Sequence, residues 1–286
     1  MLWLALTVLS TTSIGVILKL SEGRVKERLT MLLFNYITAS GISFVLWTRT
    51  GTGFYLTKNS WTLALIAGVI FALNFFLFSL SVKRRGIALP SILMRLSAIV
   101  PIFAAIFYWD EITTFVQVIG TAGALVAAVL MSIGLRGGDL KSGILKSPAA
   151  ILIIESILLL FCFGLADLSM KIFDETGIQS QKPAFFAVLF FIAAISIAVS
   201  MLTGKIVPNL KDSVCGIALG VPNLFSSYCL IAALNELPSI VVFPTVAAAT
   251  VMLIILIARF IFAEEIGRAG VAGIILTIIS LIAINL

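Results

Sequence analysis

The 286-residue sequence contains no histidine, and only 11% of its residues are charged. Histidine is the commonest metal ligand and general base near neutral pH, so its absence argues against a metal centre and against histidine-dependent catalysis. Soluble domains carry roughly 25% charged residues. A chain this poor in charge, with 61% hydrophobic residues and a mean hydropathy of +1.20, is expected to be an integral membrane protein.

Cysteine is scarce, and enzyme motifs are missing. Cys162, Cys215 and Cys229 fall within apolar stretches without CxxC spacing, so we expect buried thiols and neither disulfides nor a zinc site. The sequence also lacks GxxxxGK[ST], HExxH and GxSxG, which would indicate a nucleotide-driven pump, a zinc peptidase or a serine hydrolase. We therefore expect no cofactor, no metal and no enzymatic activity.

Ten apolar stretches are each long enough to cross a bilayer, which requires about 20 residues. They predict an all-α polytopic membrane protein with ten transmembrane helices, five in residues 1–135 and five in 149–286, joined by a polar loop at 136–148. The first stretch has no basic leader or cleavage site, so it is expected to be a retained span. The stretches are 2–20, 29–48, 61–82, 88–109, 113–135, 149–173, 183–203, 213–234, 240–263 and 267–286.

The two halves share a sequence pattern. A Lys-x-x-acid motif ends the first stretch of each half, and a proline followed by two acids and an isoleucine marks the fourth. The matching positions are Lys19, Glu22, Pro90, Asp110, Glu111 and Ile112 in the first half and Lys171, Asp174, Pro244, Glu264, Glu265 and Ile266 in the second. Because the repeated unit has an odd number of helices, its two copies must enter the membrane from opposite sides. The pattern predicts inverted repeats, as in many secondary transporters.

The five-plus-five layout and the acidic turns resemble the EamA-type domain of the drug/metabolite transporter superfamily, present twice. The segments YWDEITTFVQVIGTAGALVAAVL at 108–130 and FAEEIGRAGVAGIILTIISLI at 262–282 carry this resemblance. FNYITA at 34–39, VKRRGIALPSILMRLSAIVP at 82–101 and GVPNLFSSY at 220–228 are similar to segments of bacterial members. The resemblance implies a secondary transporter of the bacterial inner membrane. The basic triplet at 83–85 departs from the short neutral link of many members.

Arg95 lies seven residues, or roughly 10 Å, into the fourth predicted span. A charge near mid-membrane costs about 2.5–3.5 kcal/mol, so Arg95 either contacts a ligand or is neutralised by an acid of a neighbouring helix. Both interpretations stay open. Gating or hinge positions are expected at residues that can break a helix, namely Pro90, Pro101, Gly220, Pro222 and Pro244.

The sixth predicted span is also charged. Asp167 and Lys171 are spaced i,i+4 and can neutralise each other, with Lys171 reaching the interface. Glu155 has no such partner in its own helix. Because burial disfavours the charged form of a carboxylate, Glu155 and Asp167 are both candidates for carrying a coupling proton.

Uncharged polar residues gather in the second, third and eighth predicted spans. Taken singly, each is explained by hydrogen bonding between helices, whereas as a group they suggest a binding surface. With Arg95, the predicted substrate-binding residues are Asn35, Tyr36, Asn74, Asn223, Ser226, Ser227 and Tyr228. Small residues at close spacing are expected to pack helices together, at Gly120, Gly123, Ala127, Gly270 and Gly273. The twin acids at 110–111 and 264–265 are expected to shape turns and cap helices rather than form a catalytic carboxylate pair.

These features predict a secondary active transporter that uses alternating access around a central cavity lined by the fourth, sixth and eighth spans. The expected substrate is a small polar metabolite or amino acid carrying a carboxylate, because a fixed guanidinium favours an anion, and coupling is to protons or to exchange. A flippase for lipid-linked substrates and a passive channel remain alternatives. The expected partners are the substrate and membrane lipids, with no nucleic acid, and the protein is a monomer or a homodimer.

The 19 Lys and Arg residues lie mostly in short loops and show no nucleic-acid-binding cluster. Fourteen fall at odd-numbered connections between spans and four at even-numbered ones, with Arg95 inside a span. The positive-inside rule then predicts that odd connections are cytoplasmic and both termini outside. The resemblance to transporters implies the reverse, with both termini inside.

Overall fold

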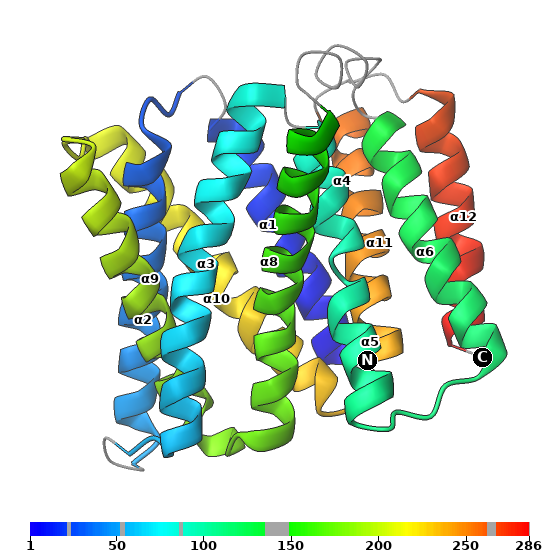
Figure 1. Ribbon diagram of the computed structural model, residues 1–286, viewed down its shortest axis with the longest axis horizontal. Helices are drawn as coiled ribbons and strands as arrows, with labels where there is room; N and C mark the ends of the chain where they lie inside the picture. Colours follow the sequence, from blue (N-terminus) through cyan, green and yellow to red (C-terminus); the bar gives the residue numbers. More distant parts are fainter. Residues whose placement is uncertain (22–23, 52–54, 86–87, 135–148, 262–266, 286) are drawn as a thin grey trace. The chain divides into compact units, whose positions relative to one another are not determined.

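The computed structural model describes residues 1–21, 24–51, 55–85, 88–134, 149–261 and 267–285. The predicted loop at 136–148 and the acids Glu264 and Glu265 lie outside this part of the chain. Regular structure in the described residues is entirely helical (Figure 1). Eight helices are long and apolar enough to cross a membrane, and two shorter apolar segments, Ile92–Tyr108 and Arg268–Ile284, complete ten. The chain is a multi-pass helical membrane protein.

The helices follow the predicted apolar stretches in order, because a backbone inside a bilayer must satisfy its own hydrogen bonds. A 3-10 helix, η1 (Gln179–Gln181), precedes α9. The α-helices are α1 (Leu2–Ser21), α2 (Arg28–Arg49), α3 (Lys58–Arg85), α4 (Ala88–Leu96), α5 (Ile99–Tyr108), α6 (Phe115–Gly134), α8 (Ala149–Thr176), α9 (Lys182–Thr203), α10 (Leu210–Leu234), α11 (Ser239–Phe260) and α12 (Arg268–Ile284).

The fourth predicted span is two helices, so the expectation of one continuous helix there is wrong. α4 ends at Leu96 and α5 begins at Ile99, with Ser97 and Ala98 in a turn between them. Pro101 explains the break, because it has no N–H to donate to the Ser97 carbonyl four residues earlier. The Val100 amide donates to that carbonyl instead, at 2.9 Å. Pro101, a predicted hinge, therefore lies at an interruption of the helix.

The other prolines do not interrupt their helices. Pro90 lies in the first turn of α4, a position where proline is tolerated, and Pro222 lies inside the continuous helix α10. Pro244 lies inside α11 and leaves the Ile240 carbonyl without its usual amide donor. The Thr121 hydroxyl of α6 donates to this carbonyl at 3.2 Å. A side chain from another helix thus satisfies the group that Pro244 frees.

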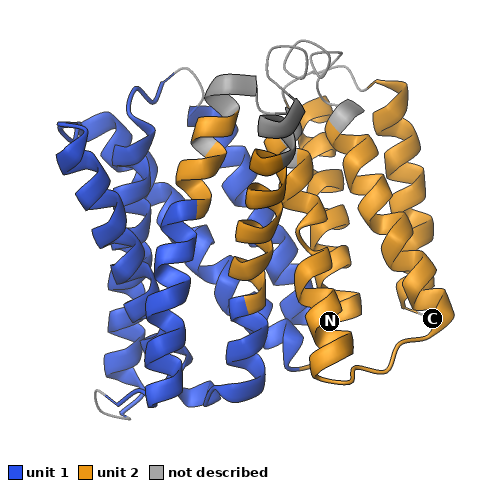
Figure 2. Ribbon diagram, viewed as in Figure 1, with its two compact units in different colours: residues 1–73, 169–235 blue, residues 74–168, 236–286 orange. Residues whose placement is uncertain are grey.

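The chain forms two compact units, and each takes helices from both halves of the sequence (Figure 2). Unit 1 comprises Met1–Leu73 and Ser169–Asn235, and unit 2 comprises Asn74–Leu168 and Glu236–Leu286. α3 and α8 are each divided between the units. The predicted repeats, 1–135 and 149–286, are therefore not the compact units, and their equivalence stays a prediction.

Within unit 1, α2 packs against α9 and α10, and α10 packs against α1. Glycines allow the closest approaches. A Cβ atom on Gly220 of α10 would lie 2.6 Å from the Asn35 carbonyl oxygen of α2, and one on Gly68 of α3 would lie 2.5 Å from the Leu189 carbonyl oxygen of α9. These helices meet backbone to backbone, as small residues permit in membrane proteins.

Within unit 2, α6 packs against α12, α11 and α4, and α11 also contacts α5 and α12. A Cβ atom on Gly120 of α6 would lie 2.9 Å from the Ile284 backbone nitrogen of α12. One on Gly273 of α12 would lie 2.9 Å from the Met131 backbone nitrogen of α6. The predicted packing role of Gly120 and Gly273 is confirmed, and the start of each helix lies against the end of the other.

Candidate functional site

Two charged residues of unit 2 lie near each other on α4 and α8. Arg95, in the last turn of α4, and Asp167 of α8 are close enough to interact electrostatically, but no ion pair or hydrogen bond joins them among the described residues. Both side chains are partly buried. Charged side chains inside a membrane face the bundle interior or a water-filled cavity, because contact with lipid is costly. The structure thus places an acid of a neighbouring helix near Arg95, and both interpretations of Arg95 stay predictions.

The predicted pair within α8 differs from what is observed. Lys171 is only 3% exposed and forms its ion pair with Glu175, one turn further along α8. Both of these residues belong to unit 1, whereas Asp167 belongs to unit 2. The acid expected to neutralise Lys171 is instead the one that interacts with Arg95.

Gly164 explains why Asp167 lies near Arg95. A Cβ atom on Gly164 would overlap the Val100 side chain and lie 3.0 Å from the Ser97 carbonyl oxygen. α8 therefore crosses the fourth span at the turn between α4 and α5. Arg95 lies just before this turn and Asp167 lies three residues after Gly164, so one crossing point positions both charges.

Asn74 joins the same unit from α3. Phe78 of α3 meets Phe163 of α8 edge to face, with ring centroids 6.1 Å apart. α3 and α8 run in opposite directions (Figure 1), so Asn74, one turn before Phe78, and Asp167, one turn after Phe163, lie on the same side of this contact. Asn74 is 6% exposed, and its Oδ1 atom has no hydrogen-bond partner among the described residues.

Glu155 is too far along α8 to belong to this cluster. It precedes Asp167 by 12 residues, or about 18 Å of helix. Its side chain is partly exposed. Both acids stay predicted candidates for carrying the coupling proton, and of the two only Asp167 lies near Arg95.

Most of the predicted substrate-binding residues that lie in unit 1 form hydrogen bonds with other residues of the protein. The Asn223 side-chain amide of α10 donates to the Asn35 Oδ1 atom of α2 at 3.2 Å. The Ser226 and Ser227 hydroxyls donate to the Asn223 carbonyl at 2.9 and 3.3 Å. The Tyr36 hydroxyl of α2 donates to the Phe71 carbonyl of α3 at 3.2 Å. Hydrogen bonding within and between helices thus accounts for these groups, and their predicted contact with a substrate stays untested.

Lys182 is a residue that the sequence analysis missed. It begins α9, is only 6% exposed, and places its Nζ atom 5.0 Å from the centre of the Tyr228 ring. Phe186 packs against Tyr228, and Phe190 stacks on Tyr36, each with centroids about 6 Å apart. The i,i+4 spacing of Lys182, Phe186 and Phe190 was the available signal, because it places all three on one face of α9.

Glu111 is a helix cap. Its carboxylate accepts hydrogen bonds from the Ser239 backbone amide at 2.8 Å and from the Ser239 hydroxyl at 2.9 Å, at the first residue of α11. Asp110 has a positive φ of 52°, as a tight turn requires. The capping and turn interpretation is confirmed for this acidic pair.

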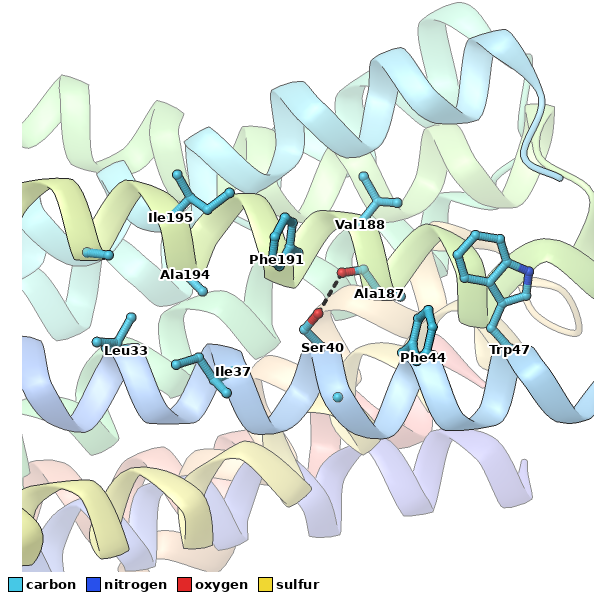
Figure 3. A pocket seen from close by; sticks show the side chains of 12 residues that line it. Leu33, Ile37, Ser40, Phe44, Trp47, Ala187, Val188, Phe191, Ala194 and Ile195 are labelled. Carbon is cyan, nitrogen blue, oxygen red and sulfur yellow. Dashed lines mark hydrogen bonds between the residues drawn. The ribbon is translucent and has the colours of Figure 1, made fainter. Parts of the chain in front are cut away.

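Two apolar pockets lie apart from the polar residues. One, with a volume of about 590 Å³, runs between α2 and α9 of unit 1 (Figure 3). The other, of about 350 Å³, lies in unit 2 between α6 and the end residues Leu96 and Ile99 of the broken span. Neither pocket is lined by a predicted substrate-binding residue. The second leaves free space beside the turn between α4 and α5.

No family model and no curated protein matches the sequence. Among solved structures, the fold is similar to a chain described only as "Crystal structure of protein", with a TM-score of 0.78 and 13% sequence identity. The similarity covers 99% of this chain and 96% of that one. At this identity the likeness establishes a shared fold over the whole chain, without a function.

Proposed function

We propose that the chain is a secondary active transporter working by alternating access, and that its substrate is a small polar metabolite or amino acid with a carboxylate. One observation carries the proposal: an arginine and an aspartate, Arg95 and Asp167, lie near each other at the interrupted helix of unit 2. Ionisable residues within membrane spans mark substrate and proton paths by default, because their insertion is costly.

The pair suggests how a proton and an anion could be coupled. A guanidinium binds a carboxylate through planar, paired N–H donors. While Asp167 is charged, it competes with a substrate carboxylate for Arg95. Protonation of Asp167 removes that competition, so proton binding favours anion binding, and release of the proton favours release of the anion.

The glycine contacts support the inverted repeats that this mechanism needs. In unit 1, the contact of Gly68 with Leu189 corresponds to that of Gly220 with Asn35, because Gly220 follows Gly68 by 152 residues and Leu189 follows Asn35 by 154. These offsets lie in the range of 152 to 154 residues that separates Lys19 from Lys171 and Pro90 from Pro244 in the sequence repeat. Each contact thus has a counterpart in which the two halves exchange roles.

Unit 2 contains a second reciprocal pair. Gly273 follows Gly120 by 153 residues, and Ile284 follows Met131 by the same number. The contact of Gly120 with Ile284 therefore matches the contact of Gly273 with Met131. The start of each of these helices contacts the end of the other, so α6 and α12 run antiparallel. This agrees with repeats of opposite orientation.

The broken fourth span supplies a place for movement. Discontinuous helices near the middle of transporters bind substrates and absorb rotation between repeats. The turn at Ser97–Ala98 directly follows the helix that carries Arg95. A rotation about this turn would change the separation of Arg95 from Asp167, which lies on another helix.

The test begins with purified protein and a thermal-shift screen of amino acids and other carboxylates, followed by uptake into liposomes under an imposed pH gradient. Arg95→Lys keeps the charge but loses the planar donors, so it should fold and bind the ligand at least tenfold more weakly. Asp167→Asn should bind but lose proton-driven accumulation. Glu155→Gln tests the second proton-coupling candidate in the same assay. Arg49→Lys, at the exposed end of α2, is the matched control.

A folded Arg95→Ala variant that still binds every ligand of the parent protein would refute the proposal. Uptake that proceeds without concentrating the substrate, whatever the pH gradient, would instead support a passive channel. Movement of a lipid-linked substrate between leaflets, without uptake of soluble carboxylates, would support a flippase.

A further inference from the structure

The apolar groove of unit 1 runs along the contact between α2 and α9 (Figure 3). Small residues hollow it out, including Gly41 on α2 and Ala187 and Ala194 on α9. Large apolar side chains border it, with Phe44 46% exposed and Phe191 57% exposed. On a membrane-spanning helix such side chains face hydrocarbon, so the groove is open to the lipid tails rather than to water.

The groove contains almost no polar surface. Ser40 is its only hydroxyl-bearing lining residue, and that hydroxyl donates to the Ala187 carbonyl at 2.9 Å, as Figure 3 shows. A polar headgroup would find no hydrogen-bonding path along this wall. An aliphatic chain is the occupant whose chemistry suits it.

The size of the groove suits one lipid chain. From Leu33 to Trp47 it follows α2 for 14 residues, or about 21 Å. One hydrocarbon chain can lie along this length within the groove's volume of about 590 Å³. A helix of a second copy would place only one face in the groove, and the test below distinguishes the two occupants.

Charge identifies the end at which a headgroup would lie. Beyond Leu33 and Ala198 the chain exposes Arg24, Lys26, Arg28, Lys205 and Lys211. Against these stand the exposed Glu27 and the buried Asp212, whose carboxylate already accepts the Lys26 and Glu27 backbone amides. The opposite end, beyond Trp47, has four basic residues, but Lys171 is buried in its ion pair with Glu175 and Lys182 is buried over the Tyr228 ring. Only Arg49 and Lys58 are exposed there among the described residues, against five basic residues at the first end.

We propose that this groove binds one acyl chain of an anionic phospholipid, with the lipid phosphate held by Arg28 and Lys205. The basic end belongs to the odd-numbered connections, which the charge distribution assigns to the cytoplasm. Basic residues at a cytoplasmic surface attract anionic lipids. The site lies in unit 1 and is independent of transport through Arg95.

The test uses the full-length protein, stripped of lipid in detergent and titrated with phosphatidylglycerol or phosphatidylcholine. Bound lipid is counted by native mass spectrometry, and the lipid-dependent rise in Tm is followed in parallel. The parent should retain one phosphatidylglycerol in preference to phosphatidylcholine. Arg28→Gln with Lys205→Gln should lower the preference roughly 30-fold, from two basic contacts. The paired control, Arg49→Gln with Lys58→Gln, should leave it unchanged.

Gly41→Leu tests the groove itself. A Cβ atom on Gly41 meets nothing within 4 Å, so the leucine can fill the groove without displacing α9. This variant should lose the bound lipid and the lipid-dependent rise in Tm, whereas Ala218→Leu, on the exposed surface of α10, should keep both. Retention of lipid by Gly41→Leu would overturn the proposal. So would a dimer that disappears in Gly41→Leu at any lipid concentration, because a second copy would then be the occupant.

Discussion

The two compact units treat polar side chains differently. In unit 1, asparagine, serine and tyrosine bond to each other or to the backbone, as Asn223 does to Asn35 and Tyr36 to Phe71. In unit 2, the spans hold an electrostatic pair, Arg95 and Asp167, and several buried oxygens without a hydrogen-bond partner among the described residues. These are Asn74 Oδ1, Ser81 Oγ, Thr245 Oγ1 and Thr250 Oγ1, against Thr30 Oγ1 alone in unit 1.

The contrast indicates a division of labour. Buried polar groups that are fully paired make a core rigid and specific, whereas unpaired ones lose stability unless water or a ligand satisfies them. Unit 1 also contains a core of fully buried phenylalanines, Phe173, Phe185, Phe186 and Phe190. It has the character of a scaffold. Unit 2 contains the interrupted helix, most of these oxygens and the residues of the proposed substrate site.

The largest expected effect concerns the charged pair of unit 2. Arg95→Ala or Asp167→Asn alone should each lower the free energy of unfolding by about 3 kcal/mol. This is the lower end of the cost of leaving one buried charge without its partner, because both side chains are partly exposed. The double variant should recover most of this loss. Chemical unfolding of all three proteins in one detergent measures the coupling. Strictly additive losses would show that the two charges do not stabilise each other.

A smaller loss should follow from overpacking the scaffold. Gly220→Ala forces a Cβ atom to within 2.6 Å of the Asn35 carbonyl oxygen, and it should cost about 1–3 kcal/mol. Gly68→Ala, the equivalent position, should cost a similar amount. Gly41→Ala is the matched control, since space is open there. Thermal unfolding compares the three, and a large difference between Gly68→Ala and Gly220→Ala would weaken the repeat.

Removing the amide pair of unit 1 should cost less. Asn223→Ala deprives Asn35 of its donor, and hydrogen bonds between membrane helices average about 0.6 kcal/mol with a maximum near 1.7. Replacing both residues by leucine should cost less than the sum of the single changes, because no polar atom is then left unpaired. If Asn223→Ala instead removes ligand binding with no loss of stability, unit 1 contributes to the substrate site and the division between units fails.

The smallest effect is expected at the proline of α11. Thr121→Val removes the hydroxyl that donates to the Ile240 carbonyl and should cost about 0.5–1.5 kcal/mol. In a Pro244→Ala background, residue 244 regains an amide N–H that can serve this carbonyl. Thr121→Val should then cost measurably less. Equal costs in both backgrounds would mean that the proline does not create the need for Thr121.

Much of the fold follows directly from the sequence, because a bilayer leaves a long apolar stretch little alternative to a helix. The ten segments and their order were predictable for that reason. The interruption at Ser97–Ala98 was not predicted as a break, although Pro101 was identified as a hinge. A single proline can either end a helix or lie within it, as Pro244 does, and neighbouring helices decide between the two.

The site was only partly predictable, because pairing between helices depends on which faces meet. Arg95 and Asp167 were both identified, yet Asp167 was assigned to Lys171 by spacing within one helix. The contact of Gly164 with the interrupted span, which brings Asp167 to Arg95, has no local signature. The spacing of Lys182, Phe186 and Phe190 did signal a shared face of α9, but the contact of Lys182 with Tyr228, 46 residues further along the chain, has no signature in the sequence.

The break in the fourth span also affects how the protein is made. Its two short helices, with an arginine between prolines, form a weak signal for insertion as the chain leaves the ribosome. The acid that favours Arg95 in the membrane, Asp167, is synthesised 72 residues later. At about 5–20 residues per second, this segment waits roughly 4–14 seconds for its partner. The fourth span is therefore expected to settle into the bilayer only after the sixth has arrived, so that biogenesis of the first half depends on translation of the second.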